Sequence, residues 1–205
     1  MPNYRQIRQA LLNHEMRLFE DFLDSIGSSP GKSADEVVAG LRGGESQQLF
    51  GMASGQFNPS KAQDFINKEQ LPTRQYDGYT LDAFGPGLSR DDLFFTFVNP
   101  GLAAFGRLND LEALLDGYIG QRATISSNKN FVDWVASLDG SGPEWGVTTG
   151  KAALNLAAPW LLNSSKQKLD LASVIGPLRA VLYQANWDNG FTAQITAICQ
   201  NPQSA

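Results

Sequence analysis

Histidine and cysteine, the side chains most often used for acid–base, nucleophilic and zinc chemistry, are scarce in this 205-residue chain. It has one histidine, His14, and one cysteine, Cys199. Zinc sites need clustered His, Cys, Asp or Glu ligands, so we expect no metal site, and no motif indicates a cofactor. His14 lies between apolar turns of a helical pattern, where a solvated or partner-facing histidine is more common than a catalytic base. These two residues therefore predict no catalytic site.

Three carboxylates form the best remaining set for catalysis. Asp91 and Asp92 are adjacent ahead of a strand pattern, and Glu144 begins another strand pattern. A small hydrolase or lyase that works without a metal could use such groups as acid and base, with one of them shifted to a higher pKa. Adjacent carboxylates at this place usually mark a solvated turn, so the enzyme is the alternative interpretation.

Aromatic residues are concentrated between positions 76 and 97. On neighbouring strands these rings cannot all fit one face of a sheet, so helices, a ligand or another subunit must cover the second face. These aromatic side chains either pack in the core or line an apolar groove or a dimer surface. The residues expected to bind a protein partner, a second copy of the chain or an apolar small molecule are Tyr76, Tyr79, Phe84 and Phe95.

Charge and hydropathy exclude two classes of partner. The net charge is −5, and the 16 Lys and Arg are spread without a basic run, whereas nucleic acids and anionic membranes require clustered positive charge. No apolar stretch approaches the ~20 residues of a membrane span. The sequence predicts a soluble protein.

The elements around these residues predict an α+β fold, mainly an antiparallel sheet covered by helices. Asn58 and Pro59 are typical of a helix start, and Asn109 with Glu112 resembles a capping box. Helices are expected over about 4–26, 59–69, 108–118, 131–138 and 151–162, and strands over 49–57, 75–84, 93–98 and 144–149. The 93–98 strand is apolar on both faces, which predicts cover on each side. Segment 36–42 is either a short strand or a helix end.

Residues 179–200 predict a hairpin with a defined register. A three-residue loop, Asp188 to Gly190, places Trp187 opposite Phe191, and in the same register it pairs Ala185 with Ala193, Tyr183 with Ile195 and Val181 with Ala197. A two-residue loop would mix polar and apolar residues on one face. Cys199 ends the apolar row of the second strand, so we expect a buried and inert thiol.

The order of elements suggests one α+β domain over residues 1–205. Two segments, about 46–105 and 143–200, have a similar order of strand, helix and strand pair, which indicates a degenerate duplication. This order favours a single sheet over two independent domains.

Several short motifs carry a resemblance to known proteins. They are Gly55 to Phe57, Tyr76 to Tyr79, Ala103 to Gly106 and Glu144 to Val147, followed by the closing hairpin. Over roughly residues 16 to 200 their order and spacing resemble a group of uncharacterised exported α+β proteins of soil bacteria. The resemblance implies an extracytoplasmic bacterial location and no assigned activity.

The abundance of patterned aromatics and the scarcity of catalytic groups predict a non-enzymatic binding or assembly module. Alanine at Tyr79 and Phe84 is then expected to abolish association and to leave the fold intact. The chain end shortly after a strand is also consistent with a fragment of a longer protein.

Overall fold

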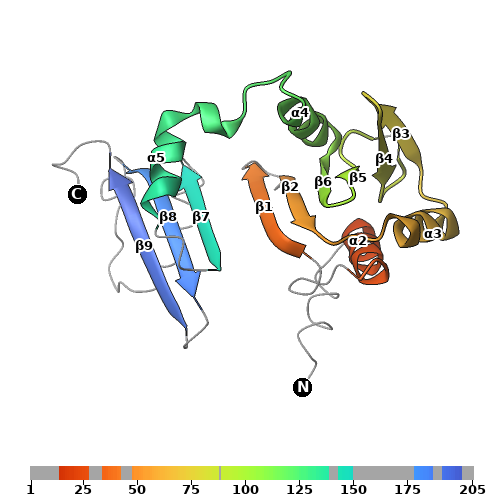
Figure 1. Cartoon of the computed structure of the whole chain (residues 1–205), viewed down its shortest axis with the longest axis horizontal. Coiled ribbons are helices and arrows are strands. Elements are labelled where there is room, and N and C mark those ends of the chain that lie inside the picture. Colours follow the sequence, from red (N-terminus) through yellow and green to blue (C-terminus); the bar gives the residue numbers. More distant parts are fainter. Residues whose placement is uncertain are drawn as a thin grey trace, which may run out of the picture. The chain divides into compact units, whose positions relative to one another are not determined.

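The computed structural model describes residues 14–27, 34–42, 48–87, 89–138, 143–149, 178–186 and 191–199. The chain forms two compact units, residues 1–122 and 123–205 (Figure 1). The first contains a six-stranded antiparallel sheet in the order β1-β2-β6-β5-β4-β3, and the second a three-stranded sheet in the order β7-β8-β9. The α+β class is confirmed. The expected single sheet is wrong, because the described strands form two, while the single domain stays a prediction.

The element bounds follow the chain in order. The larger unit contains α2 (His14–Ser25), β1 (Ala34–Arg42), β2 (Gln48–Gly55), α3 (Pro59–Glu69), β3 (Thr73–Tyr76), β4 (Tyr79–Ala83), β5 (Leu93–Asn99), β6 (Leu102–Arg107) and α4 (Leu108–Tyr118). The smaller unit contains the 3-10 turn η1 (Ile125–Ser127), α5 (Lys129–Ser137), β7 (Glu144–Thr149), β8 (Leu178–Asn186) and β9 (Thr192–Cys199). Segment 36–42, for which the sequence allows either a short strand or a helix end, is part of strand β1.

Strand β5 lies between β4 and β6, and its side chains enter two separate cores. Leu93 and Phe95 belong to one apolar cluster, whereas Phe94 belongs to the other. Successive side chains of a strand point to opposite faces, so a run of apolar residues needs cover on both sides. The predicted central strand with cover on each face is confirmed.

Helices α2 and α3 cover one face of this sheet. Phe19, Phe22 and Ile26 follow helical spacing and are buried, and Ala62 and Ile66 of α3 join the same cluster. Phe19 and Phe22 are stacked on each other, and the other ring pairs of the cluster are edge-on or tilted, arrangements that aromatic quadrupoles favour. Two such pairs are Phe22–Phe95, with ring centroids 4.8 Å apart, and Phe19–Phe84, at 5.1 Å.

Helix α3 begins where the sequence predicts. The Asn58 side chain accepts a hydrogen bond from the Lys61 N–H at 3.1 Å, and Pro59 occupies the first turn. The cap satisfies an amide that has no partner within the helix, and proline lacks the amide that would need one. The helix ends at Gln70, which takes a left-handed conformation.

Helix α4 covers the opposite face through Leu108, Leu111 and Leu115 (Figure 1). The expected capping box at Asn109 and Glu112 is wrong, because the N-cap is Arg107, whose side chain makes no capping bond. Strand β6 runs directly into the helix at that residue. The strand therefore sets the start of α4, and the capping pattern does not.

The expected single strand over 75–84 is instead a hairpin. Tyr76 pairs with Tyr79, and the loop residues Asp77 and Gly78 have φ angles of 45° and 86°. Positive φ at both loop positions is the requirement of the two-residue turn that Asp-Gly sequences favour. The dipeptide was the signal for this turn, and the surrounding aromatic alternation obscured it.

A charged contact attaches α2 to the sheet. The Arg107 guanidinium donates to both carboxylate oxygens of Glu15, at 2.8 and 2.9 Å, and the Leu93 N–H donates to the same carboxylate. Both side chains are largely shielded from water, so the ion pair is less screened than a surface pair. The described part of the predicted 4–26 helix begins at His14, and residues 1–13 lie outside the described part of the chain.

The predicted hairpin of the smaller unit has the predicted register. Ala185 pairs with Ala193, Tyr183 with Ile195 and Val181 with Ala197. Trp187 and the loop lie outside the described residues. Strand β7 pairs with β8, and there Tyr183 lies across from Gly146, where an added Cβ would be 2.1 Å from the tyrosine ring. A glycine is therefore required at position 146 for this ring to lie flat on the strand.

The two segments of the predicted duplication differ in strand pairing. Strand β2 pairs with β1 and β6, whereas β7 pairs directly with the first strand of its hairpin, β8. The helix expected over 151–162 lies outside the described residues.

Burial of Phe84 predicts that Phe84→Ala destabilises the larger unit, contrary to the expectation of an intact fold. We expect the free energy of unfolding to fall by about 3–5 kcal/mol, because a large cavity opens in the core. Urea denaturation followed by circular dichroism measures this. Val37→Ala, at an exposed site, should change it by at most about 0.5 kcal/mol, and equal losses in both variants would contradict the assignment of Phe84 to the core.

The same variant tests the predicted single domain, since all four tryptophans lie in the smaller unit. One domain unfolds cooperatively, so the tryptophan fluorescence transition should shift together with the circular dichroism transition. An unshifted fluorescence transition would show that the units unfold independently.

Candidate functional site

The structure does not bring the four predicted binding residues together on one surface. Phe84 and Phe95 are 0% and 3% exposed and pack beneath α2 and α3. Tyr76 and Tyr79 are half-buried against the cluster that α4 covers, on the other face of the sheet. Core packing therefore accounts for the two phenylalanines, which cannot contact a partner while the unit is folded. A binding role for the two tyrosines stays a prediction.

Tyr76 already has an internal partner. Its hydroxyl donates to the Asp116 carboxylate at 2.7 Å and so connects the β3–β4 hairpin to α4. The hydrogen bond to Asp116 raises the pKa of Tyr76 to about 12, because ionisation would bring two negative charges together. The tyrosine is thus a protonated donor at neutral pH.

The candidate catalytic carboxylates Asp91 and Asp92 differ in their surroundings. The Asp92 carboxylate is buried and accepts hydrogen bonds from the backbone amides of Gly87, at 2.6 Å, and Ser89, at 3.4 Å. Asp91 is exposed, and its own amide donates to the Ser89 hydroxyl at 3.1 Å. The expected solvated turn describes Asp91 but not Asp92, whose side-chain hydrogen bonds stabilise the loop between β4 and β5.

Glu144, the third carboxylate, is exposed on β7 of the smaller unit. It lies beside Tyr183, whose pKa is raised by burial and further by the charge of Glu144 and a hydrogen bond to it. The contact that the structure gives Glu144 is thus with a phenol. The hydrolase or lyase interpretation requires two carboxylates close together, and the contact of Glu144 with Tyr183 does not provide such a pair.

Asp82 is a titratable group that sequence reasoning missed. It is 8% exposed on β4, and burial raises its pKa to about 6 from the usual 3.8. Its cross-strand neighbours are Thr73 and Phe95, neither of which can act as a second acid or base. The available signal was a lone carboxylate between Leu81 and Ala83 in an otherwise apolar strand.

The described residues also contain no candidate metal-binding cluster. In that part of the chain no three His, Cys, Asp or Glu side chains group as metal ligands. Among the helices of the same residues, none is both long and apolar enough to cross a membrane.

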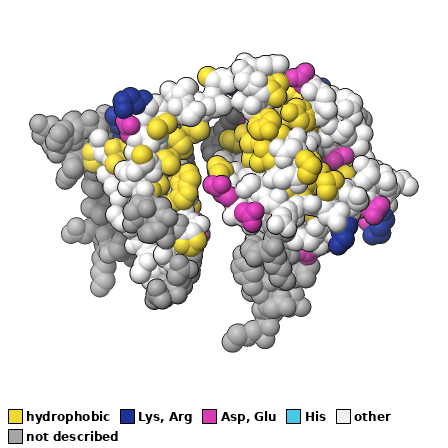
Figure 2. Space-filling model, in the orientation of Figure 1, with side chains coloured by type: hydrophobic (Ala, Val, Ile, Leu, Met, Phe, Trp, Pro, Cys, Tyr) yellow, Lys and Arg dark blue, Asp and Glu magenta, His cyan; other side chains and the backbone are white. Residues whose placement is uncertain are grey.

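Strand β9 is amphipathic, yet its apolar row is exposed. Ile195 is 63% exposed, Phe191 just ahead of the strand is 67% exposed, and Ala193 and Ala197 are exposed with them. Figure 2 shows apolar side chains at the surface of both units. Cys199, expected to be buried, is half-buried. The alternation of residues 191–199 predicts a half-buried strand, and this prediction is wrong over most of its length, because β8 is the one described element that packs extensively against β9.

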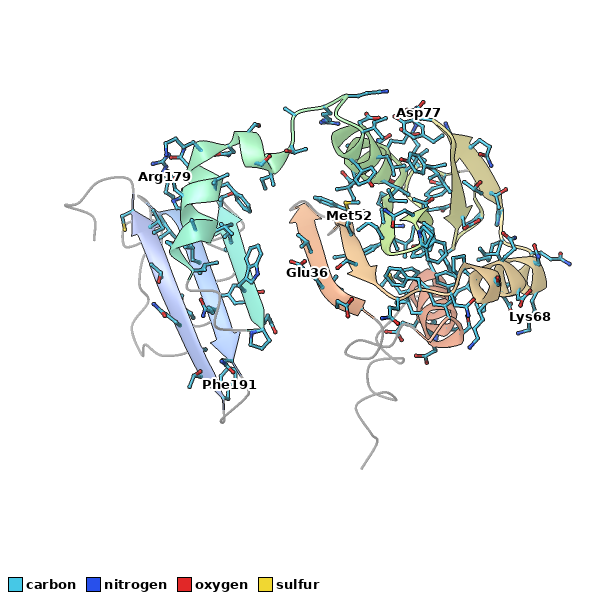
Figure 3. All side chains as sticks on the ribbon, viewed as in Figure 1. Glu36, Met52, Lys68, Asp77, Arg179 and Phe191 are labelled. Carbon is cyan, nitrogen blue, oxygen red and sulfur yellow. The ribbon has the colours of Figure 1, made fainter. Side chains whose placement is uncertain are left out.

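A second exposed apolar strand lies in the larger unit. Val37 and Val38 of β1 are 56% and 51% exposed on opposite faces. Strand β1 forms the end of the six-stranded sheet. Figure 3 labels Glu36 on this strand and Phe191 beside β9. Exposed apolar residues on edge strands are the features of the described surface that most need a partner.

The raised pKa of Asp82 predicts a specific pH dependence of stability. A group whose folded pKa lies above its unfolded pKa stabilises the fold fully below the unfolded value, and this contribution disappears as pH rises through the folded value. Ionisation of Asp82 should therefore lower the free energy of unfolding by about 1–2 kcal/mol between pH 4 and pH 6.5. Asp82→Asn should remove this part of the pH dependence in urea titrations.

Asp91→Asn provides the control for Asp82→Asn, because Asp91 is exposed. It should keep the wild-type pH dependence. Identical pH profiles for wild type and Asp82→Asn would contradict the assignment.

No family model, curated protein or solved structure among those compared with this chain matches it.

Proposed function

We propose that this protein is a non-enzymatic binding module that engages a protein partner through the exposed apolar row of β9. The observation that carries this proposal is that row, Ala193, Ile195 and Ala197, on a strand whose alternation is typical of one packed face. An exposed apolar strand face is unfavourable in water unless another surface covers it. The proposal moves the binding surface from the phenylalanines of the core to the smaller unit.

The neighbouring strand supports the same surface. Val181 and Ala185 of β8 lie opposite Ala197 and Ala193 and are buried, so the apolar face continues inward from the edge. Tyr183, opposite Ile195, is half-buried and adds a ring with a polar tip. Aromatic and aliphatic side chains beside one another are typical of the centre of a protein interface.

A protein partner fits this surface better than an apolar small molecule, the other ligand that the sequence suggests. The groove expected for such a ligand depended on uncovered phenylalanines, and these are filled by ring contacts with α2 and α3, such as Phe22 against Phe84 at 5.0 Å. A strand face at a sheet edge is open and extended, a shape that suits another polypeptide.

Native mass spectrometry of protein purified gently from its own host tests the proposal. We expect wild-type protein to retain the mass of a different polypeptide, and Ile195→Ser to weaken this association at least tenfold, since about 1.4 kcal/mol of apolar contact is lost. The added mass should dissociate on denaturation.

Ile125→Ser is a matched control, because Ile125 is the same residue type and is 61% exposed against 63% for Ile195. It lies in η1, away from β9 in the sequence. Retention of the partner by the Ile125 variant and its loss from the Ile195 variant supports the β9 surface. Equal retention by both variants contradicts it.

A further inference from the structure

Strand β1 is a long edge with exposed apolar side chains. It spans Ala34–Arg42 and takes part in the sheet through β2 alone, so its other side carries backbone groups that no described strand pairs. Residues Asp35 to Ala39 are exposed. The opposite edge strand, β3, has only four residues. The usual protections of an edge are short strands, charged side chains, proline and bulges. In β1 the irregularity lies between Ala34 and Glu36 and the charges lie at the two ends, so the stretch from Val37 to Leu41 has none of these protections.

We propose that β1 pairs with β1 of a second copy of this chain, in antiparallel orientation, to give one continuous sheet. The sequence of the strand is complementary to itself under this operation, since acidic residues lie near its start, an arginine lies at its end and small or apolar residues lie between. This surface belongs to the larger unit and is independent of the β9 surface proposed above.

The faces of the strand restrict the register. A two-fold axis perpendicular to the sheet keeps each face on its own side, and residues directly opposite one another must share a face. The axis must therefore lie level with one residue, which faces its own copy across the two strands. It cannot lie level with the midpoint between two consecutive residues. Centred on Ala39, it places Ala39 opposite itself and acidic position 36 opposite basic position 42, twice by symmetry.

The neighbouring registers lose this complementarity. An axis at Val38 places Glu36 opposite Gly40, and an axis at Gly40 places Val38 opposite Arg42. Opposite charges that face one another across strands are stabilising, whereas an unmatched charge at an edge disfavours pairing. The Ala39-centred register is therefore selected by charge.

The packing of Phe50 supports the same register. Gly40 pairs with Phe50 of β2, whose ring lies over the glycine so closely that an added Cβ would be 2.5 Å from its Cζ. With the axis at Ala39, Val38 of the second copy lies opposite Gly40. Its side chain then meets the Phe50 ring, and an aromatic beside a β-branched residue is a favourable cross-strand pair.

Disulfide trapping tests the register directly. With Cys199 replaced by serine, Ala39→Cys places two thiols opposite each other at a Cα separation of about 4.5–5.5 Å, within disulfide range. Glu36→Cys separates its two copies by six residues along the strand, about 20 Å. We expect rapid covalent dimer from Ala39→Cys under mild oxidation and none from Glu36→Cys. Equal crosslinking of the two, or none from Ala39→Cys, overturns the proposal.

Charge reversal tests the pairing without a covalent bond. A two-strand contact is smaller than a standard interface, so sedimentation equilibrium must be run at high protein concentration. Glu36→Arg and Arg42→Glu should each lose wild-type self-association, because like charges then face each other. An equimolar mixture should restore it as a heterodimer, and so should the double variant. Monomeric wild-type protein, or self-association that survives Glu36→Arg, overturns the proposal.

The two proposals fail separately in these experiments. Ile195→Ser should leave the Ala39→Cys crosslink unchanged, and Glu36→Arg should leave the partner mass of the native complex unchanged. Circular dichroism of each variant shows that it is folded. A crosslink that disappears with Ile195→Ser overturns the β1 pairing and assigns self-association to β9.

Discussion

Burial of both faces of β5 is the constraint on which the larger unit depends. Leu93 and Phe95 point to one side of the sheet and Phe94 to the other, so each side must be covered. Helices α2 and α3 provide one cover, and α4 provides the other. The Glu15 carboxylate holds α2 in place by accepting hydrogen bonds from Arg107 and from the Leu93 amide at the start of β5 itself. The helix that covers the strand is thus attached to the strand.

This arrangement uses most of the aromatic surface that suggested a binding site. The phenylalanines of α2 and β5 contact one another and Phe84, which follows β4, and Phe84 and Phe95 are left with almost no exposed surface for a partner. The exposed apolar strands of the described residues lie instead where the sheets end. Strand β1 ends one sheet and β9 ends the other, and both expose apolar side chains that an internal strand would bury.

Three acidic side chains of the larger unit have different surroundings: Asp82 and Asp92 are buried, and Asp116 is half-buried. Asp92 accepts amide hydrogen bonds from its own loop, Asp116 accepts from Tyr76, and Asp82 shares its face of β4 with aromatic neighbours. The loop amides of Gly87 and Ser89 need an acceptor such as Asp92, because unpaired buried amides are costly. Asp92 and Asp116 thus stabilise the fold through hydrogen bonds, whereas burial disfavours the ionised form of Asp82. The binding surfaces proposed at β1 and β9 contain no buried carboxylate.

The sequence by itself determined the features that depend on neighbours in the chain. Asn58 and Pro59 set the start of α3, the alternation of residues 181–197 set the β8–β9 register, and the run from Leu93 to Val98 predicted a strand covered on both faces. Each depends on local capping or on a side-chain period that a few residues establish. The tertiary structure decided which apolar rows are covered. Phe84 and Phe95 are buried, whereas the equally apolar row of β9 is exposed, because burial depends on distant elements that pack over a strand and alternation reports only that the strand has an apolar face.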